Sequence, residues 1–186
     1  MTRDLKRQHS RAAMIQAATQ LFLGQGFDAS TMDQVAESAG VSRRTLFRYF
    51  PSKVDLVFPE HDRRLSDFQV ELARDPQAPA ITRVQRALLT LVDDCEAGSE
   101  QLLQQAQIVS GNPALLAAEL ELDSQWEAAM ARTLAQDMDP TQARLMAGAL
   151  SGLTRATLRE WLASGTTIAL RALAQHAQSL LIPLES

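Results

Sequence analysis

Residues 30–53 read Ser-Thr-Met-Asp-Gln-Val-Ala-Glu-Ser-Ala-Gly-Val-Ser-Arg-Arg-Thr-Leu-Phe-Arg-Tyr-Phe-Pro-Ser-Lys, and this stretch decides the fold. Thr31 and Gln34 stand three residues apart, as in a capping box that begins a helix. Gly40 provides the left-handed residue that ends this helix, and Ser42 is placed to cap another. The stretch therefore predicts two short helices joined by a tight turn.

The second helix, over about residues 43–49, has a polar face that suits the reading of DNA. At about 100° per residue, Leu46 points inward while Arg44 and Arg48 point outward together. The first turn of a recognition helix meets base edges in the major groove, and here it holds Ser42, Arg43 and Thr45. Arginine suits bidentate bonding to guanine, although an outward arginine pair taken alone is more often a solvated face. Together with the caps and the turn, the pattern predicts a helix-turn-helix that binds double-stranded DNA.

A longer pattern surrounds this motif over about residues 10–56. Its members are Leu21, Phe22, Gly26, Phe27, Thr31, Val35, Ala36, Ala39, Gly40, Val41, Ser42, Thr45, Leu46, Phe47, Tyr49, Phe50 and Lys53. In this pattern the chain resembles the TetR family of bacterial transcriptional regulators. The resemblance implies base contacts from three residues of the second helix, Arg43, Arg44 and Thr45. It also implies phosphate contacts from Thr31, Tyr49 and Lys53. Phe47 stands where many members carry tyrosine, so we expect packing or a thymine-methyl contact from it.

Charge divides the chain into a basic and an acidic part. Residues 1–54 carry a net charge of +4 and residues 55–186 a net charge of −8, which together give the −4 of the whole chain. We therefore expect a helix-turn-helix DNA-binding domain over 1–54 and a helical effector-binding and dimerisation domain over 55–186. Arg3, Lys6, Arg7 and Arg11 form a basic arm that either lies along the DNA phosphates, enters the minor groove or is disordered. No apolar leader or membrane-length run is present, so we expect a cytoplasmic protein.

The remaining sequence reads as helices separated by short Gly- and Pro-containing breaks. The expected fold is all-α, with about nine helices and an N-terminal three-helix domain. After the helix-turn-helix, the expected helices cover about 52–74, 80–96, 99–109, 113–137, 141–163 and 166–181. The first of these helices should link the two domains.

The last two expected helices are candidates for a subunit interface. Small residues recur every four positions in the first of them, at Gly148, Gly152 and Ala156. The final helix carries a broad apolar stripe that includes Leu170, Leu173, Ala177 and Leu180. The resemblance implies a homodimer built on a four-helix bundle from these helices, which would present two recognition helices to a palindromic operator. The alternative is that both stripes are buried within one monomer.

The middle helices are expected to enclose a mostly apolar effector pocket. Its candidate lining residues are Phe68, Leu102, Leu103, Trp126, Met130, Met146, Leu150 and Trp161. Arg155 is a candidate partner for an acidic ligand group. For each of these residues, plain core or surface is the alternative. The segments Asn112-Pro-Ala-Leu-Leu, Trp126-Glu and Leu158-Arg-Glu-Trp resemble those of a TetR subgroup associated with acyl-CoA-like effectors.

An enzyme and a cofactor-dependent protein are both disfavoured by the sequence. Glu60-His61-Asp62 lacks the histidine spacing of a zinc helix, and Glu119, Asp123 and Glu127 more often form a solvated stripe than a metal site. The lone Cys95 excludes an internal disulfide. An adaptor that binds proteins without DNA is the third class considered. The favoured function is a ligand-responsive repressor that leaves its operator when a small, largely apolar effector binds.

Overall fold

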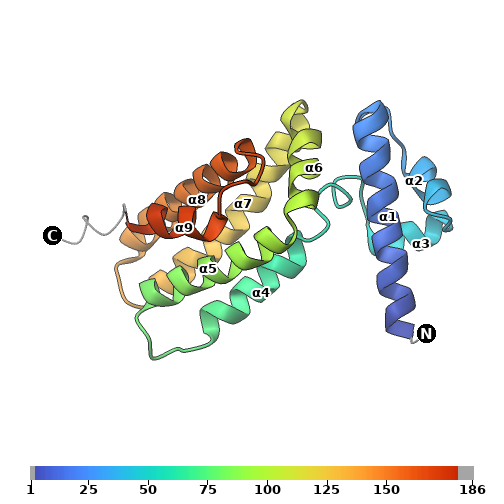
Figure 1. Cartoon of the computed structure of the whole chain (residues 1–186). Coiled ribbons are helices and arrows are strands. Elements are labelled where there is room, and N and C mark those ends of the chain that lie inside the picture. Colours follow the sequence, from blue (N-terminus) through green and yellow to red (C-terminus); the bar gives the residue numbers. More distant parts are fainter. Residues whose placement is uncertain (1–2, 180–186) are drawn as a thin grey trace. The chain divides into compact units, whose positions relative to one another are not determined.

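The computed structural model describes residues 3–179, and within this range the chain forms nine helices and no strands (Figure 1). The helices are α1 Arg3–Gln25, α2 Met32–Ser38, α3 Arg43–Tyr49, α4 His61–Ala73, α5 Ala80–Ala97, α6 Ser99–Ser110, α7 Pro113–Leu134, α8 Pro140–Ala163 and α9 Leu170–Ser179. The all-α fold expected from the sequence is confirmed. Among the described helices, none is long and apolar enough to cross a membrane.

The chain separates into two compact units. The first contains Met1–Glu60 and Gln104–Ala118, and the second contains His61–Leu103 and Glu119–Ser186. The sequence-based boundary at residue 54 thus lies inside the first unit, just before the corner that leads to α4.

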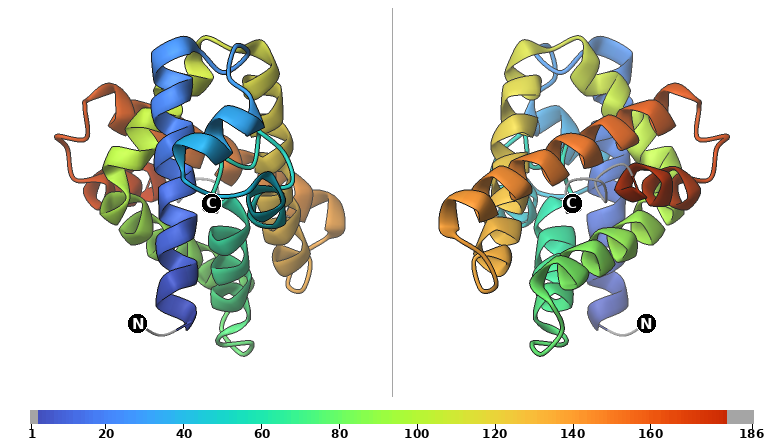
Figure 2. Two further views of the ribbon diagram at one scale, coloured as in Figure 1. Left: turned by 90° about the vertical axis from the view of Figure 1, so that its right-hand side faces the viewer. Right: turned by 90° about the vertical axis from the view of Figure 1, so that its left-hand side faces the viewer.

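In the first unit, α2 and α3 lie on one side of α1, as the left view of Figure 2 shows. Their shared core consists of buried apolar side chains, chiefly Met14, Ala18, Phe22, Val35, Leu46 and Phe50. Thr31 caps α2 with a complete capping box to Gln34, and Gly40 has a left-handed φ of 65° directly after the helix. Both local predictions are confirmed, and they fix where α2 ends and where α3 begins.

The helix expected over residues 52–74 begins nine residues later than predicted, at His61. Ser52 does cap a turn, because its backbone N–H donates to Asp55 Oδ2 at 2.6 Å and Asp55 N–H donates back to Ser52 Oγ at 3.3 Å. That turn does not extend into a helix, because Pro59 lacks the N–H that the next turn requires. The residues up to Glu60 therefore form a corner.

Two buried clusters build the second unit. The larger joins α4, α5, α7 and α8, with Phe68, Met130, Leu134 and Leu150 among its members. The smaller joins α5, α8 and α9 and contains Val92, Cys95, Trp161, Leu170 and Ala174. One face of α5 serves both, since its buried residues Val84, Leu88, Val92 and Cys95 recur three or four positions apart.

The last helix starts later than expected and packs against its own chain. The expected range began at residue 166, but Gly165 and Thr166 both have left-handed φ values, of 66° and 61°, and α9 begins at Leu170. Trp161 Nε1 donates to the Ile168 carbonyl at 3.0 Å, which holds this turn against the end of α8. Since α9 contacts both α5 and α8 (Figure 1), it forms part of the monomer core.

Candidate functional site

The outward face of α3 carries the cationic side chains expected to read DNA. Arg44 is exposed, and among the described residues its side chain has no hydrogen bond, ion pair or aromatic contact. Arg43 is exposed too, but it pairs with Asp33 of α2 at 3.1 Å and stacks on the Phe47 ring at 5.4 Å. A solvent-exposed pair of this kind contributes little free energy, so Arg43 can exchange Asp33 for a DNA partner at low cost.

The guanidinium groups of Arg48 and Arg7 both lie over the ring of Tyr49. Their Cζ atoms stand 5.5 Å and 5.9 Å from the ring centre, within the range of cation–π attraction. Arg7 belongs to α1, which begins at Arg3, so this stretch is helical and not disordered. Sequence reasoning did not connect Arg7 with Tyr49, and no local signal reveals a pairing between residues so far apart in the chain.

Two hydroxyl groups cap the starts of α2 and α3, and a third forms a hydrogen bond to one of them. Thr31 Oγ1 accepts from the Gln34 backbone N–H at 3.2 Å, and Ser42 Oγ accepts from the Thr45 N–H at 3.2 Å. The Ser42 and Thr45 hydroxyls also lie 2.9 Å apart and share a hydrogen bond. These side chains remain at the surface, and their caps fix the backbone N–H groups at the starts of both helices.

Lys53 is directed at the loop between α1 and α2. Its Nζ donates to the carbonyl oxygens of Phe27 at 2.6 Å and Ser30 at 2.9 Å. An ammonium group has three donors, so one N–H is left for a partner outside the domain. Lys53 therefore has an internal structural role in addition to the phosphate contact that the resemblance implies.

The nine candidate effector residues are distributed over the second unit instead of lining one cavity. Phe68, Met130 and Leu150 lie in the larger buried cluster, with Trp126 and Met146 packed against it. Trp161 belongs to the smaller cluster, Leu102 packs against it, and Leu103 is partly buried. Arg155 pairs with Asp123 across α7 and α8 at 3.2 Å. Periodicity identified buried faces correctly but did not indicate where a cavity lies between them.

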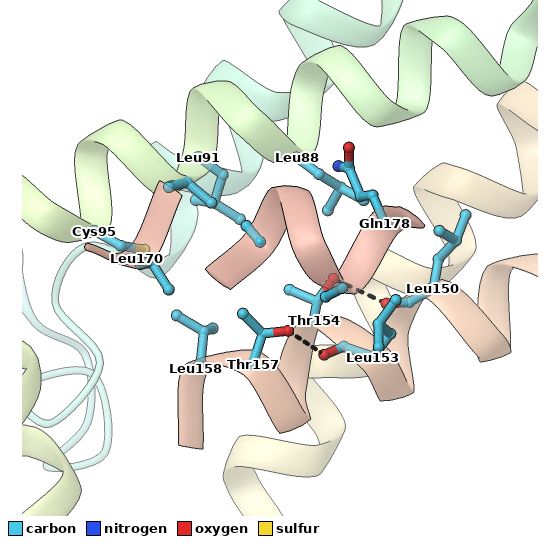
Figure 3. A pocket seen from close by; sticks show the side chains of 13 residues that line it. Leu88, Leu91, Cys95, Leu150, Leu153, Thr154, Thr157, Leu158, Leu170 and Gln178 are labelled. Atoms are coloured by element: carbon cyan, nitrogen blue, oxygen red, sulfur yellow. Dashed lines mark hydrogen bonds between the residues drawn. The ribbon is translucent and has the colours of Figure 1, made fainter. Parts of the chain in front are cut away.

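A small apolar pocket of about 40 Å³ lies between α5, α8 and α9 (Figure 3). The side chains that surround it include Leu88, Leu91, Cys95, Leu153, Leu158 and Leu170, and only Leu150 of the nine candidates joins them. The Thr154 and Thr157 hydroxyls at its wall donate to the Leu150 and Leu153 carbonyls of the same helix at 2.8 Å. With those hydroxyls satisfied, the wall is effectively apolar, apart from Gln178.

Cys95 at this pocket is a packing residue. It is buried, and burial raises the pKa of its thiol to about 11, with the Asp94 and Glu96 charges adding to the shift against the nearby Arg64 and Arg63. Because the thiolate is the reactive form, this environment makes Cys95 a poor redox sensor.

The acidic stripe on α7 is half-buried against α8, whereas a solvated stripe was expected. Burial, and then the neighbouring Asp123 charge, raise the pKa of Glu119, while Arg159 and Arg155 lower it by less. Burial likewise raises the pKa of Asp123, against the attraction of Arg155. The stripe is therefore part of the α7–α8 packing, and the described residues include no cluster with metal-ligand geometry.

The residues expected to form a subunit interface have different surroundings. Gly152 and Ala156 face open space on α8, whereas a Cβ at Gly148 would lie 3.7 Å from Glu127 of the same chain. Leu170 is 0% exposed and Ala177 is also buried, because both pack on α5 and α8 of their own chain, and Leu173 is half-buried. These two residues are therefore buried within one chain, which is the alternative that the sequence left open for this stripe. Leu180 lies outside the described residues.

A residue missed by sequence reasoning completes the exposed stripe of α8. Leu145 is 71% exposed, and it is followed at spacings of four, three and four by Ala149, Gly152 and Ala156. This spacing keeps the four residues on one helix face. The same spacing is present in the sequence, but the strict four-residue repeat of small residues from Gly148 does not include Leu145.

A capped helix-turn-helix with an arginine-bearing second helix, carried by an all-α chain, defines the class of helix-turn-helix DNA-binding regulators. Residues 14–58 match the family described as bacterial regulatory proteins, tetR family. The HTH-type transcriptional regulator TcmR of Streptomyces glaucescens is 30% identical over 171 residues, which are 86% of this chain and 76% of that protein. The chain therefore belongs to the TetR family of bacterial transcriptional regulators, whose members are not enzymes.

Solved structures share the fold over nearly the whole chain. FadR of Thermus thermophilus, a TetR family repressor crystallised with lauroyl-CoA, gives a TM-score of 0.64 at 21% identity, covering 92% of this chain and 93% of that one. NalD, the secondary repressor of the MexAB-OprM efflux pump in Pseudomonas aeruginosa, gives 0.69 at 18% identity, with 95% and 96% covered. At these identities the likeness establishes the common fold.

Proposed function

We propose that this protein is a homodimeric transcriptional repressor of the bacterial cytoplasm that leaves a palindromic operator when an apolar effector binds. Residues 1–54 form its DNA-binding domain, and residues 55–186 bind the effector and the partner subunit. The observation that carries the proposal is the outward face of α3, where Arg44 is exposed and makes no contact within the described chain while its helix is held by caps and a buried core. A cation presented in this way suits the major groove.

The roles on DNA follow from what each side chain is free to do. Arg43, Arg44 and Thr45 read bases, and Phe47, 36% exposed, contacts a thymine methyl. Thr31 and Ser42 bring backbone N–H groups to phosphates at the two helix starts. Arg48 and Tyr49, with Lys53 through its remaining donor, add further phosphate contacts.

The dimer forms through the exposed stripe of α8. Leu145, Ala149, Gly152 and Ala156 are small or apolar and share one face, so two copies of α8 can approach closely there. Gly152 supports this role because, among the described residues, no atom outside its own helix lies within 4 Å of the position of a Cβ. Two recognition helices are needed because half-sites of a palindrome lie about one DNA turn apart.

The effector enters the pocket between α5, α8 and α9. Its present volume of about 40 Å³ is far below the roughly 300–1,000 Å³ of drug-sized ligand sites, so the bound state must separate α9 from its two neighbours. Because the effector binds the opened state more tightly than the closed state, it shifts the population toward the opened state. The acyl chain of an acyl-CoA-like molecule matches the apolar character of the wall, and the structurally similar FadR was crystallised with lauroyl-CoA. Isothermal titration with medium- and long-chain acyl-CoA thioesters tests this class, and absence of binding across the series would remove it.

The experiment for the DNA-binding function is selection of bound sequences from random duplex DNA, followed by anisotropy titrations of the selected site. We expect a palindrome, bound by a dimer. Arg44→Ala should weaken binding by about 1–3 kcal/mol and relax the base preference at one position of each half-site. Arg74→Ala removes an exposed arginine from the second unit and should leave binding unchanged. No enrichment of any sequence, or equal effects of the two substitutions, would overturn the proposal.

A further inference from the structure

A second, open pocket of about 330 Å³ lies in the second unit between the end of α4, the start of α5 and the end of α7. Unlike the apolar pocket, it is lined mainly by polar side chains: Gln69, Arg83, Arg132, Thr133 and Gln136. The two pockets share no lining residue. This second pocket has no part in the proposed DNA, dimer or effector contacts.

Arg83 is an unusual component of this pocket because it is a buried cation without a carboxylate partner. It is 5% exposed, and its Nε donates to the Leu72 carbonyl at 2.7 Å while its Nη1 donates to Gln136 Oε1 at 2.8 Å. Among the described residues it forms no ion pair. Burial of an unpaired charge is costly, so such groups are normally compensated by an opposite charge.

The acidic residues next to these two acceptors are engaged elsewhere. Glu71, which precedes Leu72, pairs with Arg86 at 2.7 Å and with Arg74 at 3.4 Å. Asp137, which follows Gln136, accepts the Ala80 backbone N–H at 2.5 Å, at the first turn of α5. Neither carboxylate lies within ion-pair distance of Arg83.

Arg132 adds a second positive charge to the same pocket. It is exposed, and its side chain forms no ion pair with any residue that the structure describes. The ends of α4 and α7 lie here and contribute about half a negative charge each, while the start of α5 contributes about half a positive charge. These partial charges do not cancel the two guanidinium groups, so the pocket stays net positive and favours an anionic group.

We infer that this pocket is a binding site for a small oxyanion, a carboxylate or a phosphate monoanion, held between Arg83 and Arg132. Arg132 reaches the anion from the solvent side and Arg83 from the buried side. Gln136 is fixed by its bond to Arg83, and its amide N–H₂ remains able to donate to the ligand. Thr133 is a wall residue, because its hydroxyl donates to the Ala129 carbonyl at 3.1 Å. A ligand with this group would stabilise the junction of α4, α5 and α7.

Thermal unfolding of the full-length protein tests the site, with inorganic phosphate or acetate replacing chloride at constant ionic strength. A ligand that binds only the folded state raises the melting temperature in a saturable way. We expect saturation with at least one of the two anions, and the one that saturates identifies the ligand class. Arg132→Gln should weaken the apparent affinity about tenfold or more, as loss of a charge-assisted contact does. Arg144→Gln, an exposed arginine on α8, is the matched control and should leave the affinity unchanged.

The arginine Nε–H signals in nuclear magnetic resonance spectra give a second readout that does not depend on stability. Two of these signals should shift with the anion, and one of them should be absent in Arg132→Gln. Arg83→Lys keeps the charge but loses the forked geometry, so binding should be weakened if this variant folds. The inference is overturned if the response saturates with neither anion. It is also overturned if Arg132→Gln binds the anion as tightly as Arg144→Gln and the unmodified protein do.

Discussion

The Lys53 ammonium lies 4.1 Å from the centre of the Phe27 ring and donates a hydrogen bond of 2.6 Å to the Phe27 carbonyl. This double contact fastens the turn after α3 to the loop between α1 and α2, which Lys53 also reaches through the Ser30 carbonyl at 2.9 Å. The loop precedes the Thr31 cap of α2. Lys53 thereby helps to hold α2 and α3 in place.

Lys53→Ala should therefore lower both stability and DNA affinity. We expect a loss of about 1–3 kcal/mol in the free energy of unfolding, because two hydrogen bonds from a charged donor disappear. DNA binding should weaken for all sequences alike, and the salt dependence should flatten by about one unit if the third donor contacts a phosphate. Urea unfolding and anisotropy titrations at several salt concentrations measure the two effects.

The chain's other lysine, Lys6, is a matched control for this substitution. It is exposed on α1, and its side chain makes no hydrogen bond, ion pair or cation–π contact with the residues that the structure describes. Lys6→Ala should leave the free energy of unfolding within about 0.5 kcal/mol of the original value. If Lys53→Ala proves as neutral as Lys6→Ala in unfolding, the carbonyl contacts of Lys53 do not stabilise the domain.

The helix-turn-helix could be predicted from the sequence because its signals are local. The capping box, the left-handed glycine and the serine cap each act over only a few residues of the chain. The helices α2 and α3 therefore begin and end close to where the sequence indicated. The linking helix was misplaced for a related reason. Ser52 does cap a turn, but Pro59 seven residues later prevents that turn from becoming a helix.

The proposed effector pocket and the proposed subunit interface could not be predicted in the same way, because both depend on which helices meet. Periodicity marked Leu170 and Ala177 as apolar-face residues, but it could not distinguish a partner subunit from α5 and α8 of the same chain. A cavity is space that packed side chains leave unfilled. No spacing rule places such a space beside Leu153 instead of beside Met130.

Leu145→Glu should convert the protein to a monomer. Among the described residues, Leu145 is the most exposed large apolar side chain, at 71%, and a charge placed within a helix–helix contact would be buried without a partner. Sedimentation equilibrium should give the monomer mass, and affinity for the palindromic site should fall, because one recognition helix then acts alone. Val70→Glu is the control, since Val70 is 68% exposed on α4 and has no part in the proposed interface. A dimeric Leu145→Glu variant would exclude the α8 stripe as the interface.

Asp94→Asn should destabilise the second unit at neutral pH. Asp94 accepts from Arg64 at 2.6 Å and from Arg63 at 2.8 Å, which joins the start of α4 to α5. Burial raises the pKa of Asp94, but these hydrogen bonds and charges outweigh it and hold the pKa below its ordinary 3.8. A lowered pKa contributes stability above 3.8 that is lost as the pH falls through the folded-state value.

The loss in free energy of unfolding caused by Asp94→Asn should therefore be constant from neutral pH to about pH 5, because Asp94 is ionised there in both the folded and the unfolded state. The loss should become smaller below pH 3.8. Urea unfolding at a series of pH values measures it. Asp67→Asn is the control, because Asp67 pairs with Arg63 at the surface and such pairs contribute little. A deficit that grows on acidification would contradict the role given to the Asp94 carboxylate.

Glu119→Gln should have the opposite effect and stabilise the protein at neutral pH. Burial and the Asp123 charge raise the pKa of Glu119 above its ordinary 4.5. A raised carboxyl pKa contributes stability that is fully present below 4.5 and is lost as the pH rises through the folded-state value, because the folded state then holds a costly charge. The neutral amide of Gln avoids that cost. The gain in free energy of unfolding should therefore be largest near pH 7 and should vanish toward pH 4.5. Glu121→Gln, on the exposed side of α7, should show no such pH dependence. If Glu119→Gln is instead less stable at pH 7, attraction to Arg155 and Arg159 exceeds the cost of burial, and the acidic stripe stabilises the α7–α8 contact.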